Sequence, residues 1–183
     1  MTDKYANGLD KVYGKYLLQY VGKAISLLEI GVAEGQSLMM FEGILPDAQV
    51  YGFDINIPGL NRNTRAIIET IDQTDSKAIE DFAVRHGGFD VIIDDGSHFT
   101  YETKNCFDIL WKYTREFYVI EDWGICIADD LMYHTKYKDR VLGMGELVLD
   151  IAMRRKELDI GYVEIVLNNK HSYALYKTKG EHY

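Results

Sequence analysis

Hydrophobic and polar residues alternate along the chain in two periods, one typical of β-strands and one typical of α-helices. Short apolar runs over residues 27–30, 49–53, 65–71, 89–93 and 117–120 predict strands. The segments between them carry apolar residues every three or four positions, which predicts helices packed on a core. Such repeated alternation is typical of a parallel sheet with helices on both faces. The pattern therefore predicts an α/β fold.

The two ends of the chain extend this pattern. Helices are predicted over residues 9–21, where Gly22 ends the helix, and over residues 141–158. Residues 162–167 and 172–177 alternate between apolar and polar positions around the sequence Asn-Asn-Lys, which predicts a β-hairpin.

A glycine turn follows the first predicted strand. The stretch over 27–35 reads Leu-Leu-Glu-Ile-Gly-Val-Ala-Glu-Gly and leads into a predicted helix. Glycines at such a turn let a ligand lie against the backbone, next to the N–H groups of the helix. Ala33 and Gln36 break the Gly-x-Gly-x-x-Gly pattern of dinucleotide sites, and Glu-x-Gly-x-x-x-Gly from Glu29 to Gly35 remains. An ordinary tight turn between strand and helix is the alternative.

An aspartate ends the second predicted strand, directly after Phe53. In nucleotide-binding α/β sheets, an acidic side chain in the position of Asp54 accepts hydrogen bonds from ribose hydroxyls. The alternative is an aspartate that caps the following loop. Together with the glycine turn, Asp54 indicates a site for a nucleoside-containing ligand at the carboxyl ends of the strands.

Acidic residues also end the fourth and fifth predicted strands. Asp94 and Asp95 begin the sequence Asp-Asp-Gly-Ser-His, and Glu121 and Asp122 follow the fifth strand. If these strands are neighbours, the acids lie roughly 5 Å apart at the backbone, where like charges repel unless a cation or a proton intervenes. Carboxylates with open water positions suit Mg²⁺ or a similar ion. Loop capping, or direct hydrogen bonds to a substrate, are the alternatives for Asp95, Glu121 and Asp122.

A histidine completes the turn after the fourth strand. His98 stands three residues after Asp95, and the unperturbed histidine pKa of about 6.5 suits a general base. A cation nearby would lower the pKa of a substrate hydroxyl, and His98 would take its proton. A solvated histidine in a polar turn is the alternative. His134, His171 and His182 carry no comparable motif and stay unassigned.

Composition and charge exclude several classes of protein. Acidic residues outnumber basic ones, 29 to 20, and the net charge of −9 gives no footprint for a nucleic-acid backbone. There is neither a signal-peptide pattern nor an apolar run that would span a membrane, so we expect a cytoplasmic protein without nucleic-acid or membrane partners. Cys106 and Cys126 lack metal-type spacing and are expected to be reduced, packed thiols. The 183 residues are expected to form one domain over 1–183, with an N-terminal helix at about 7–22 and a core over 24–183.

A series of segments in the first two thirds of the chain matches a known family, in the family's order. They read Thr-Asp-Lys at 2–4, Leu-Leu-Glu-Ile-Gly-Val at 27–32 with Ser-Leu at 37–38, Val-Tyr-Gly-Phe-Asp-Ile at 50–55, Asp-Gln-Thr-Asp at 72–75, Asp-Val-Ile-Ile-Asp-Asp-Gly-Ser-His at 90–98 and Tyr-Val-Ile-Glu-Asp at 118–122. With them the chain resembles the metal-dependent, S-adenosylmethionine (SAM)-dependent sugar O-methyltransferases that modify macrolides, which are close to the cephalosporin hydroxylase-like family. The resemblance implies a class I methyltransferase fold, a three-layer, Rossmann-like, mostly parallel sheet closed by a C-terminal antiparallel hairpin.

The resemblance also implies a role for each matched residue. Asp95, Glu121 and Asp122 would bind Mg²⁺, and His98 would act as the general base beside Asp95. Asp54 would contact the ribose of SAM, and the turn over 72–73 would lie near its adenine. The cofactor-binding residues expected from the motifs are Glu29, Gly31, Gly35, Ser37, Asp54, Ile55, Asp72, Gln73 and Asp94.

The expected function is a Mg²⁺-assisted, SAM-dependent O-methylation of a hydroxyl group on a sugar or another small polyhydroxylated acceptor. The alternatives are a catechol-like phenol as acceptor, a SAM-binding module without catalysis, and a nicotinamide oxidoreductase. The match fades after Trp123, so the acceptor, which Trp123, Tyr133, His134 and Tyr137 would help to contact, is not identified. The chain is expected to be close to a bare catalytic core, and a homo-oligomer stays open.

Overall fold

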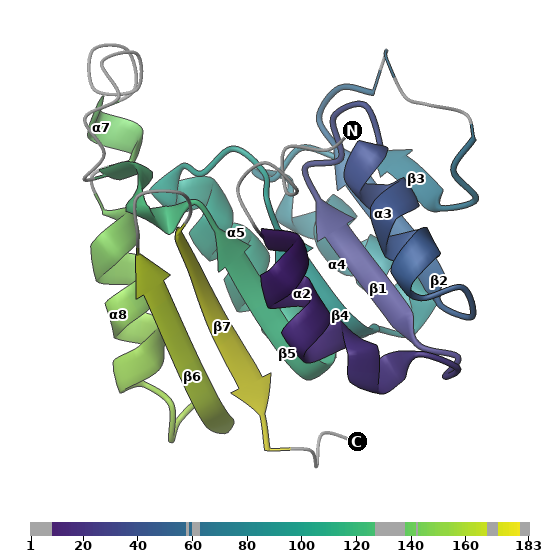
Figure 1. The fold of residues 1–183 in the computed structure, drawn as a ribbon. Helices are drawn as coiled ribbons and strands as arrows, with labels where there is room; N and C mark the ends of the chain where they lie inside the picture. The colour runs from purple at the N-terminus through teal and green to yellow at the C-terminus, as the bar shows by residue number, and fades with distance from the viewer. Residues whose placement is uncertain are drawn as a thin grey trace.

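One mixed seven-stranded sheet organises the structure, a computed structural model that describes residues 9–57, 59, 63–126, 138–141, 143–167 and 172–179. Within these residues the strand order is β3-β2-β1-β4-β5-β7-β6, and helices cover both faces (Figure 1). The strands are β1 (Ser26–Ile30), β2 (Gln49–Asp54), β3 (Ile67–Thr70), β4 (Phe89–Asp94), β5 (Thr114–Glu121), β6 (Ile160–Leu167) and β7 (Ser172–Thr178). The α-helices are α2 (Leu9–Leu17), α3 (Gln36–Ile44), α4 (Ser76–His86), α5 (Thr100–Leu110), α7 (Lys138–Val141) and α8 (Met144–Met153), and the 3₁₀ helices are η1 (Leu18–Tyr20), η2 (Trp111–Tyr113) and η3 (Trp123–Cys126).

The strand order creates a switch point in the middle of the sheet. β1 to β5 pair in parallel, and β7 lies antiparallel between β5 and β6. From β1 the chain moves outwards to β2 and β3, and then returns to the other side of β1 with β4 and β5. Ligands of open α/β sheets bind where the order reverses, at the carboxyl ends of the strands. Here that position lies beyond Ile30, which pairs with Phe53 of β2 and Asp94 of β4.

Two apolar clusters bury the sheet, one on each face. α2 and α3 cover one face, where Leu17 and Phe41 are fully buried (Figure 1). α4, α5 and α8 cover the other face, with Phe82 and Phe107 at its centre. Because β4 contributes side chains to both clusters, its apolar run shows no polar alternation, as expected for a strand covered on both sides. The predicted three-layer, mostly parallel sheet with a C-terminal antiparallel hairpin is confirmed.

Local signals in the sequence account for both ends of α4 and for the end of the first helical segment. The side chain of Asp75 caps α4, accepting a hydrogen bond from the N–H of Ala78 at 3.0 Å, and Gly87 ends this helix with a φ of 72°. Gly22 follows η1 with a φ of 77°. These ends lie where the sequence predicts them.

The predicted helix over 141–158 is wrong in its bounds. The structure has two helices here, α7 and α8, with Gly143 as the N-cap residue of α8, and residues 154–159 form a turn before β6. A Cβ on Gly143 would lie 2.8 Å from Cγ2 of Thr100, so the chain passes close to α5 at this point. The apolar spacing does not reveal the end of α8, because Leu158 in the following turn continues the apolar pattern and also packs on the core.

Three further expectations concern membrane-spanning helices, the two cysteines and the number of domains. None of the helices in the described ranges combines the length and apolar content that a membrane crossing requires. Cys106 is a buried free thiol, as predicted, whereas the side chain of Cys126 and the segments 2–4 and 168–170 lie outside what the structure describes. The assignment of 1–183 to a single domain stays a prediction.

Candidate active site

The backbone of the glycine turn lies directly against the loop that follows β4. Gly31 has a φ of 81°, and a Cβ on it would lie 2.2 Å from the carbonyl oxygen of Asp95. The N–H of Asp95 donates to the carbonyl of Ile30 at 3.0 Å. Only glycine fits this contact, since a side chain would push the two loops apart. The turn therefore sets the distance between the tips of β1 and β4.

A cavity of about 440 Å³ opens beside this turn. It lies at the switch point of the sheet, where a small organic ligand is expected to bind. The sequence-predicted cofactor residues Gly31, Asp54, Ile55, Asp72 and Gln73 line it. Its other lining residues are Ile30, Ala33, Phe53, Thr74, Asp95, Gly96, Ser97, Phe99, Glu102 and Arg140.

Two backbone hydrogen bonds fix the carboxylate of Asp54 in the cavity wall. Oδ2 accepts from the N–H of Ala33 at 2.9 Å, and Oδ1 accepts from the N–H of Asn56 at 3.1 Å. An ionised carboxylate accepts about four hydrogen bonds, so acceptor positions remain for a ligand. Asp54 therefore links the end of β2 to the glycine turn and presents an acidic hydrogen-bond acceptor to the cavity.

Gln73 connects the turn after β3 to the loop after β4. Its Oε1 accepts from the N–H of Ser97 at 2.8 Å, and its Nε2 donates to Oδ1 of Asp94 at 3.3 Å. The neighbouring Asp72 accepts from both the N–H and the hydroxyl of Thr74 at 2.8 Å, and these hydrogen bonds lower the pKa of Asp72. The turn over 72–74 is therefore a rigid wall of the cavity.

Four of the predicted cofactor residues, Glu29, Gly35, Ser37 and Asp94, do not line the cavity. Ser37 donates to Oε2 of Glu29 at 2.6 Å in the buried space between β1 and α3, and Gly35 is the N-cap residue of α3. Asp94 is only 2% exposed and accepts from the hydroxyl of Tyr118 at 2.9 Å. None of the four is among the residues that line the described cavity, so their direct contact with a ligand stays a prediction.

Asp94 lies beneath the cavity and not on the far side of the sheet. It is the last residue of β4, and its partner Tyr118 belongs to the same apolar cluster as Ile30 and Phe53, which line the cavity. Burial raises the pKa of Asp94 to about 7, although the hydrogen bond from Tyr118 acts in the opposite direction. Asp94 therefore fixes the side chains of Gln73 and Tyr118 by accepting a hydrogen bond from each of them.

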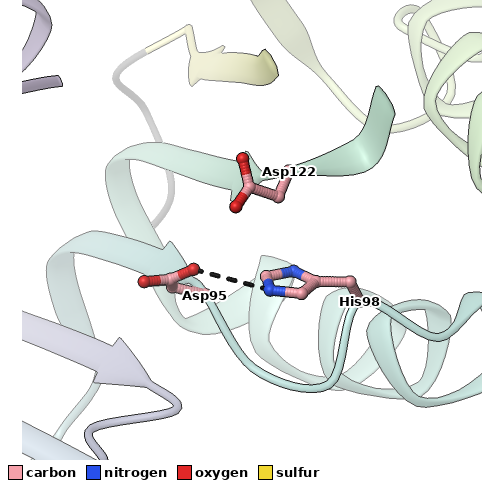
Figure 2. Close-up of side chains that lie close together, drawn as sticks. All are labelled: Asp95, His98 and Asp122. Atoms are coloured by element: carbon pink, nitrogen blue, oxygen red, sulfur yellow. Dashed lines mark ion pairs between the residues drawn. The ribbon is translucent and has the colours of Figure 1, made fainter. Parts of the chain in front are cut away.

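Asp95, His98 and Asp122 form a compact group at the tips of β4 and β5. Each offers one ligand atom, and the three atoms lie within 4.8 Å of one another (Figure 2). Asp95 and His98 come from the loop after β4, with Oδ1 and Nε2 3.8 Å apart, and Asp122 follows β5. All three side chains are partly buried. Two carboxylates and an imidazole at this separation are a donor set that fits a divalent cation.

Backbone strain coincides with this group. His98 has a φ of 55° and Asp122 a φ of 50°, in the left-handed region that residues with side chains rarely adopt. The N–H of Asp122 donates to the carbonyl of Ser172 at 2.7 Å, so β7 helps to hold this conformation. Strain persists only where surrounding contacts enforce it, and it is typical of functional sites.

Glu121, the third cation ligand that the sequence predicts, lies outside this group of three. It is the last residue of β5, is 1% exposed, and accepts a hydrogen bond from the hydroxyl of Tyr13 on α2. Burial, followed by the charge of Glu121, raises the pKa of Tyr13. The structure groups His98, rather than Glu121, with the two aspartates.

Sequence reasoning missed one wall of the cavity. Arg140 of α7 forms an ion pair with Glu102 of α5, and its guanidinium carbon lies 3.7 Å from the centroid of the Phe99 ring. All three residues line the cavity. No signal in the sequence around Arg140 could have found this wall, because it depends on how α7 packs against α5.

The segment predicted to contact an acceptor is described only in part. Trp123 begins η3, and its indole N–H donates to the carbonyl of Val166 at 3.2 Å. Tyr133, His134 and Tyr137 lie outside the described residues, as do His171 and His182.

Comparisons with known proteins agree with this geometry. No family model matches the chain. Over 121 residues the chain is 36% identical to the mycinamicin VI 2''-O-methyltransferase of Micromonospora griseorubida, and over 119 residues it is 31% identical to the demethylmacrocin O-methyltransferase of Streptomyces fradiae. Each match covers 60% of this chain and 30% of the relative, so the chain spans only about a third of the length of these curated relatives.

A solved structure shares the arrangement of the strands and helices. The MycE methyltransferase from the mycinamycin biosynthetic pathway, in complex with Mg and SAH, matches with a TM-score of 0.71 and 25% sequence identity. The match covers 93% of this chain and 50% of that one. Together with the strand order and the glycine turn, these similarities show that the chain has the fold of class I methyltransferases and that 60% of it is similar in sequence to macrolide-sugar O-methyltransferases.

Proposed function

We propose that the protein is a SAM-dependent O-methyltransferase that works with a divalent cation such as Mg²⁺ and methylates a hydroxyl group of a sugar or another small polyhydroxylated molecule. One observation carries the proposal. Asp95 lines the cavity beside the glycine turn and also belongs to the group with His98 and Asp122. A ligand in the cavity and a cation at the group would therefore contact the same residue, which is the proximity that a cation-assisted group transfer requires.

The cavity fits the chemistry of SAM. This molecule carries no phosphate, and the turn lacks the dinucleotide pattern that serves a pyrophosphate. Asp54 would accept hydrogen bonds from the ribose hydroxyls, Asp72 and Gln73 would lie near the adenine, and Gly31 would leave room for the methionine part. The SAH in the solved MycE complex supports this assignment.

The group at the strand tips fits a divalent cation. Asp95 and Asp122 supply the hard oxygen donors that Mg²⁺ prefers, and the Mg in the MycE complex supports this choice. Glu121, at the same strand tip, is the third carboxylate expected to contribute. When bound, a divalent cation supplies Lewis-acid chemistry, which lowers the pKa of a hydroxyl group and orients it.

The proximity of His98 to Asp95 supports a role for His98 as general base. Its Nε2 lies 3.8 Å from Oδ1 of Asp95, next to the cavity, so Asp95 would orient the imidazole. In the proposed transfer the acceptor oxygen forms a bond to the methyl carbon of SAM, and the bond from sulfur to that carbon breaks. The proton of the acceptor hydroxyl goes to His98.

The sugar class of acceptor rests on the relatives, which act on mycinamicin VI and demethylmacrocin by name. A catechol-like phenol would present two neighbouring oxygens in a similar way, and a SAM-binding module without catalysis would need the cavity alone. Calorimetry with S-adenosylhomocysteine and methyl-transfer assays on both acceptor classes, with and without EDTA, test the proposal. We expect S-adenosylhomocysteine to bind with micromolar affinity. Methyl transfer to a sugar hydroxyl should occur, and EDTA should abolish it. Binding without transfer to either class would favour the module, and no binding would refute the assignment.

A further inference from the structure

The hydrogen bond from Tyr13 to Glu121 joins the first described helix to the tip of β5. The two residues are 108 positions apart in the sequence, and both are 1% exposed. A buried phenol needs a hydrogen-bond partner, but a neutral carbonyl would serve as well. A buried carboxylate is costly, and it is kept where it is paired or where it binds a cation. The position of Glu121 directly before Asp122 points to the second reason.

The ring of Tyr13 has a fixed position above the sheet. Its centroid lies 5.3 Å from that of Phe41 on α3 with the rings at 89°, and Leu17, one turn further along α2, is fully buried. α2 packs on the face of the sheet beside β5, where Tyr16 contacts Phe117 (Figure 1). The phenol hydroxyl therefore reaches Glu121 from a rigid support.

This arrangement carries an inference that rests on the proposed function and extends it. We propose that Tyr13 is a positioning residue of the cation site: its hydroxyl holds the buried carboxylate of Glu121 at the tip of β5, next to Asp122, where the negative charge of Glu121 favours a cation bound at the group of Asp95, His98 and Asp122. Carboxylates that bind metal ions are themselves held by hydrogen bonds, and loss of such an outer partner costs about 10–100-fold in metal affinity. Tyr13 acts through Glu121 and does not touch the substrate.

Binding of Mn²⁺, followed by the electron paramagnetic resonance of the free ion, tests this role without an activity assay. The variant is Tyr13→Phe, which removes one hydroxyl and keeps the ring. The matched control is Tyr20→Phe, because Tyr20 is also buried and packs on Phe117 at a centroid distance of 6.3 Å. Phe117 lies four residues before Glu121 on β5, roughly 13 Å away.

We expect Tyr13→Phe to weaken Mn²⁺ binding by about tenfold, while Tyr20→Phe changes it less than about twofold. Binding of S-adenosylhomocysteine should be equal in both variants, which shows that the fold and the cavity are intact. Unchanged Mn²⁺ affinity in Tyr13→Phe overturns the inference and leaves the proposed function standing. Absence of Mn²⁺ binding to the unmodified protein overturns both.

A second variant separates positioning from general packing. The substitution Glu121→Gln makes the side chain at position 121 neutral. In that background, removal of the Tyr13 hydroxyl does not leave a buried carboxylate without its hydrogen-bond donor. We expect Tyr13→Phe combined with Glu121→Gln to bind Mn²⁺ as weakly as Glu121→Gln alone. A further loss in the double variant would show that Tyr13 acts by another route and would overturn the inference.

Discussion

The Cβ position of Gly31 and the carbonyl oxygen of Asp95 are 2.2 Å apart, so the glycine turn and the loop after β4 fit together with no room for a methyl group. This contact brings the cavity and the carboxylate–histidine group to one edge of the sheet. Asp95 is the residue that both parts of the site share.

Substitution of this glycine should damage both the fold and the ligand site. Gly31→Ala combines a φ of 81° with a backbone overlap, and we expect a loss of about 3 kcal/mol or more in the free energy of unfolding. Gly22→Ala is the matched control: its φ is 77°, but a Cβ there meets nothing within 4 Å, so it should cost only about 1 kcal/mol. Urea unfolding of the two variants measures the difference. Equal losses would show that the close contact contributes nothing.

Asp54 should contribute to ligand affinity more than to stability. Asp54→Asn keeps the shape of the side chain but removes its charge and one acceptor, so we expect about tenfold weaker binding of S-adenosylhomocysteine. Calorimetry measures this, with Asp47→Asn as a control at an exposed turn outside the cavity. Equal affinity in both variants would remove Asp54 from the ribose site.

His98 should affect turnover and not cofactor binding. A general base contributes about 10²–10⁴-fold to a rate, so His98→Gln should lower kcat by this factor while the affinity for S-adenosylhomocysteine stays unchanged. His86→Gln, at the end of α4, should keep kcat because the contacts that it changes, with Tyr51, Phe82 and Glu69, lie outside the cavity.

Mn²⁺ binding to His98→Gln distinguishes a base from a ligand. His98 shares the 4.8 Å group with Asp95 and Asp122, so both roles have support in the geometry. We expect Mn²⁺ affinity to persist in this variant. A loss comparable to that of Asp122→Asn would assign His98 to the cation instead.

Glu164 on β6 should make stability depend on pH in the acidic range. It accepts hydrogen bonds from Lys15 and Tyr162, both at 2.8 Å, and from Tyr173. Burial acts to raise the pKa of Glu164, but the hydrogen bonds outweigh it and lower the pKa from 4.5 to about 2. Since the folded value is the lower one, the charged group stabilises the fold above about pH 4.5, and this contribution is lost as the pH falls towards 2.

Glu164→Gln should therefore lower the free energy of unfolding by about 1–3 kcal/mol at pH 7, and by less at pH 3.5. Urea unfolding at both pH values measures the difference. Glu157→Gln is the control, because its partner Arg154 is a surface residue and exposed ion pairs contribute little. If the difference in the free energy of unfolding between Glu164→Gln and the unmodified protein does not shrink with falling pH, this account is contradicted.

The fold was predictable because its signals are local. The apolar run of β4, the cap of Asp75 and the glycines around the first turn each act within a few residues, and each marks the element that the structure contains. The carboxyl ends of parallel strands share one edge, so the cavity at Asp54 and the proximity of Asp95 to Asp122 also followed from the order of motifs.

The remaining features of the site depend on packing between distant segments. Asp94 and Asp95 are neighbours in the sequence, yet only Asp95 lines the cavity, because Asp94 is buried at the end of β4 against Gln73 and Tyr118. The contact of Arg140 with Glu102 and that of Tyr13 with Glu121 join helices whose relative placement no local pattern specifies. Such contacts become visible only once the helices are placed on the sheet.

The position of β7 between β5 and β6 has a consequence for biosynthesis. Strands β1 to β5 precede it in the chain, and a nascent polypeptide can pair them while later residues are still inside the ribosome. The N–H of Asp122, however, is held by the carbonyl of Ser172, the first residue of β7. The edge of the sheet that carries Asp122 therefore reaches its final conformation only after β7 has left the exit tunnel, later than the ends of β1 and β2, which line the cavity.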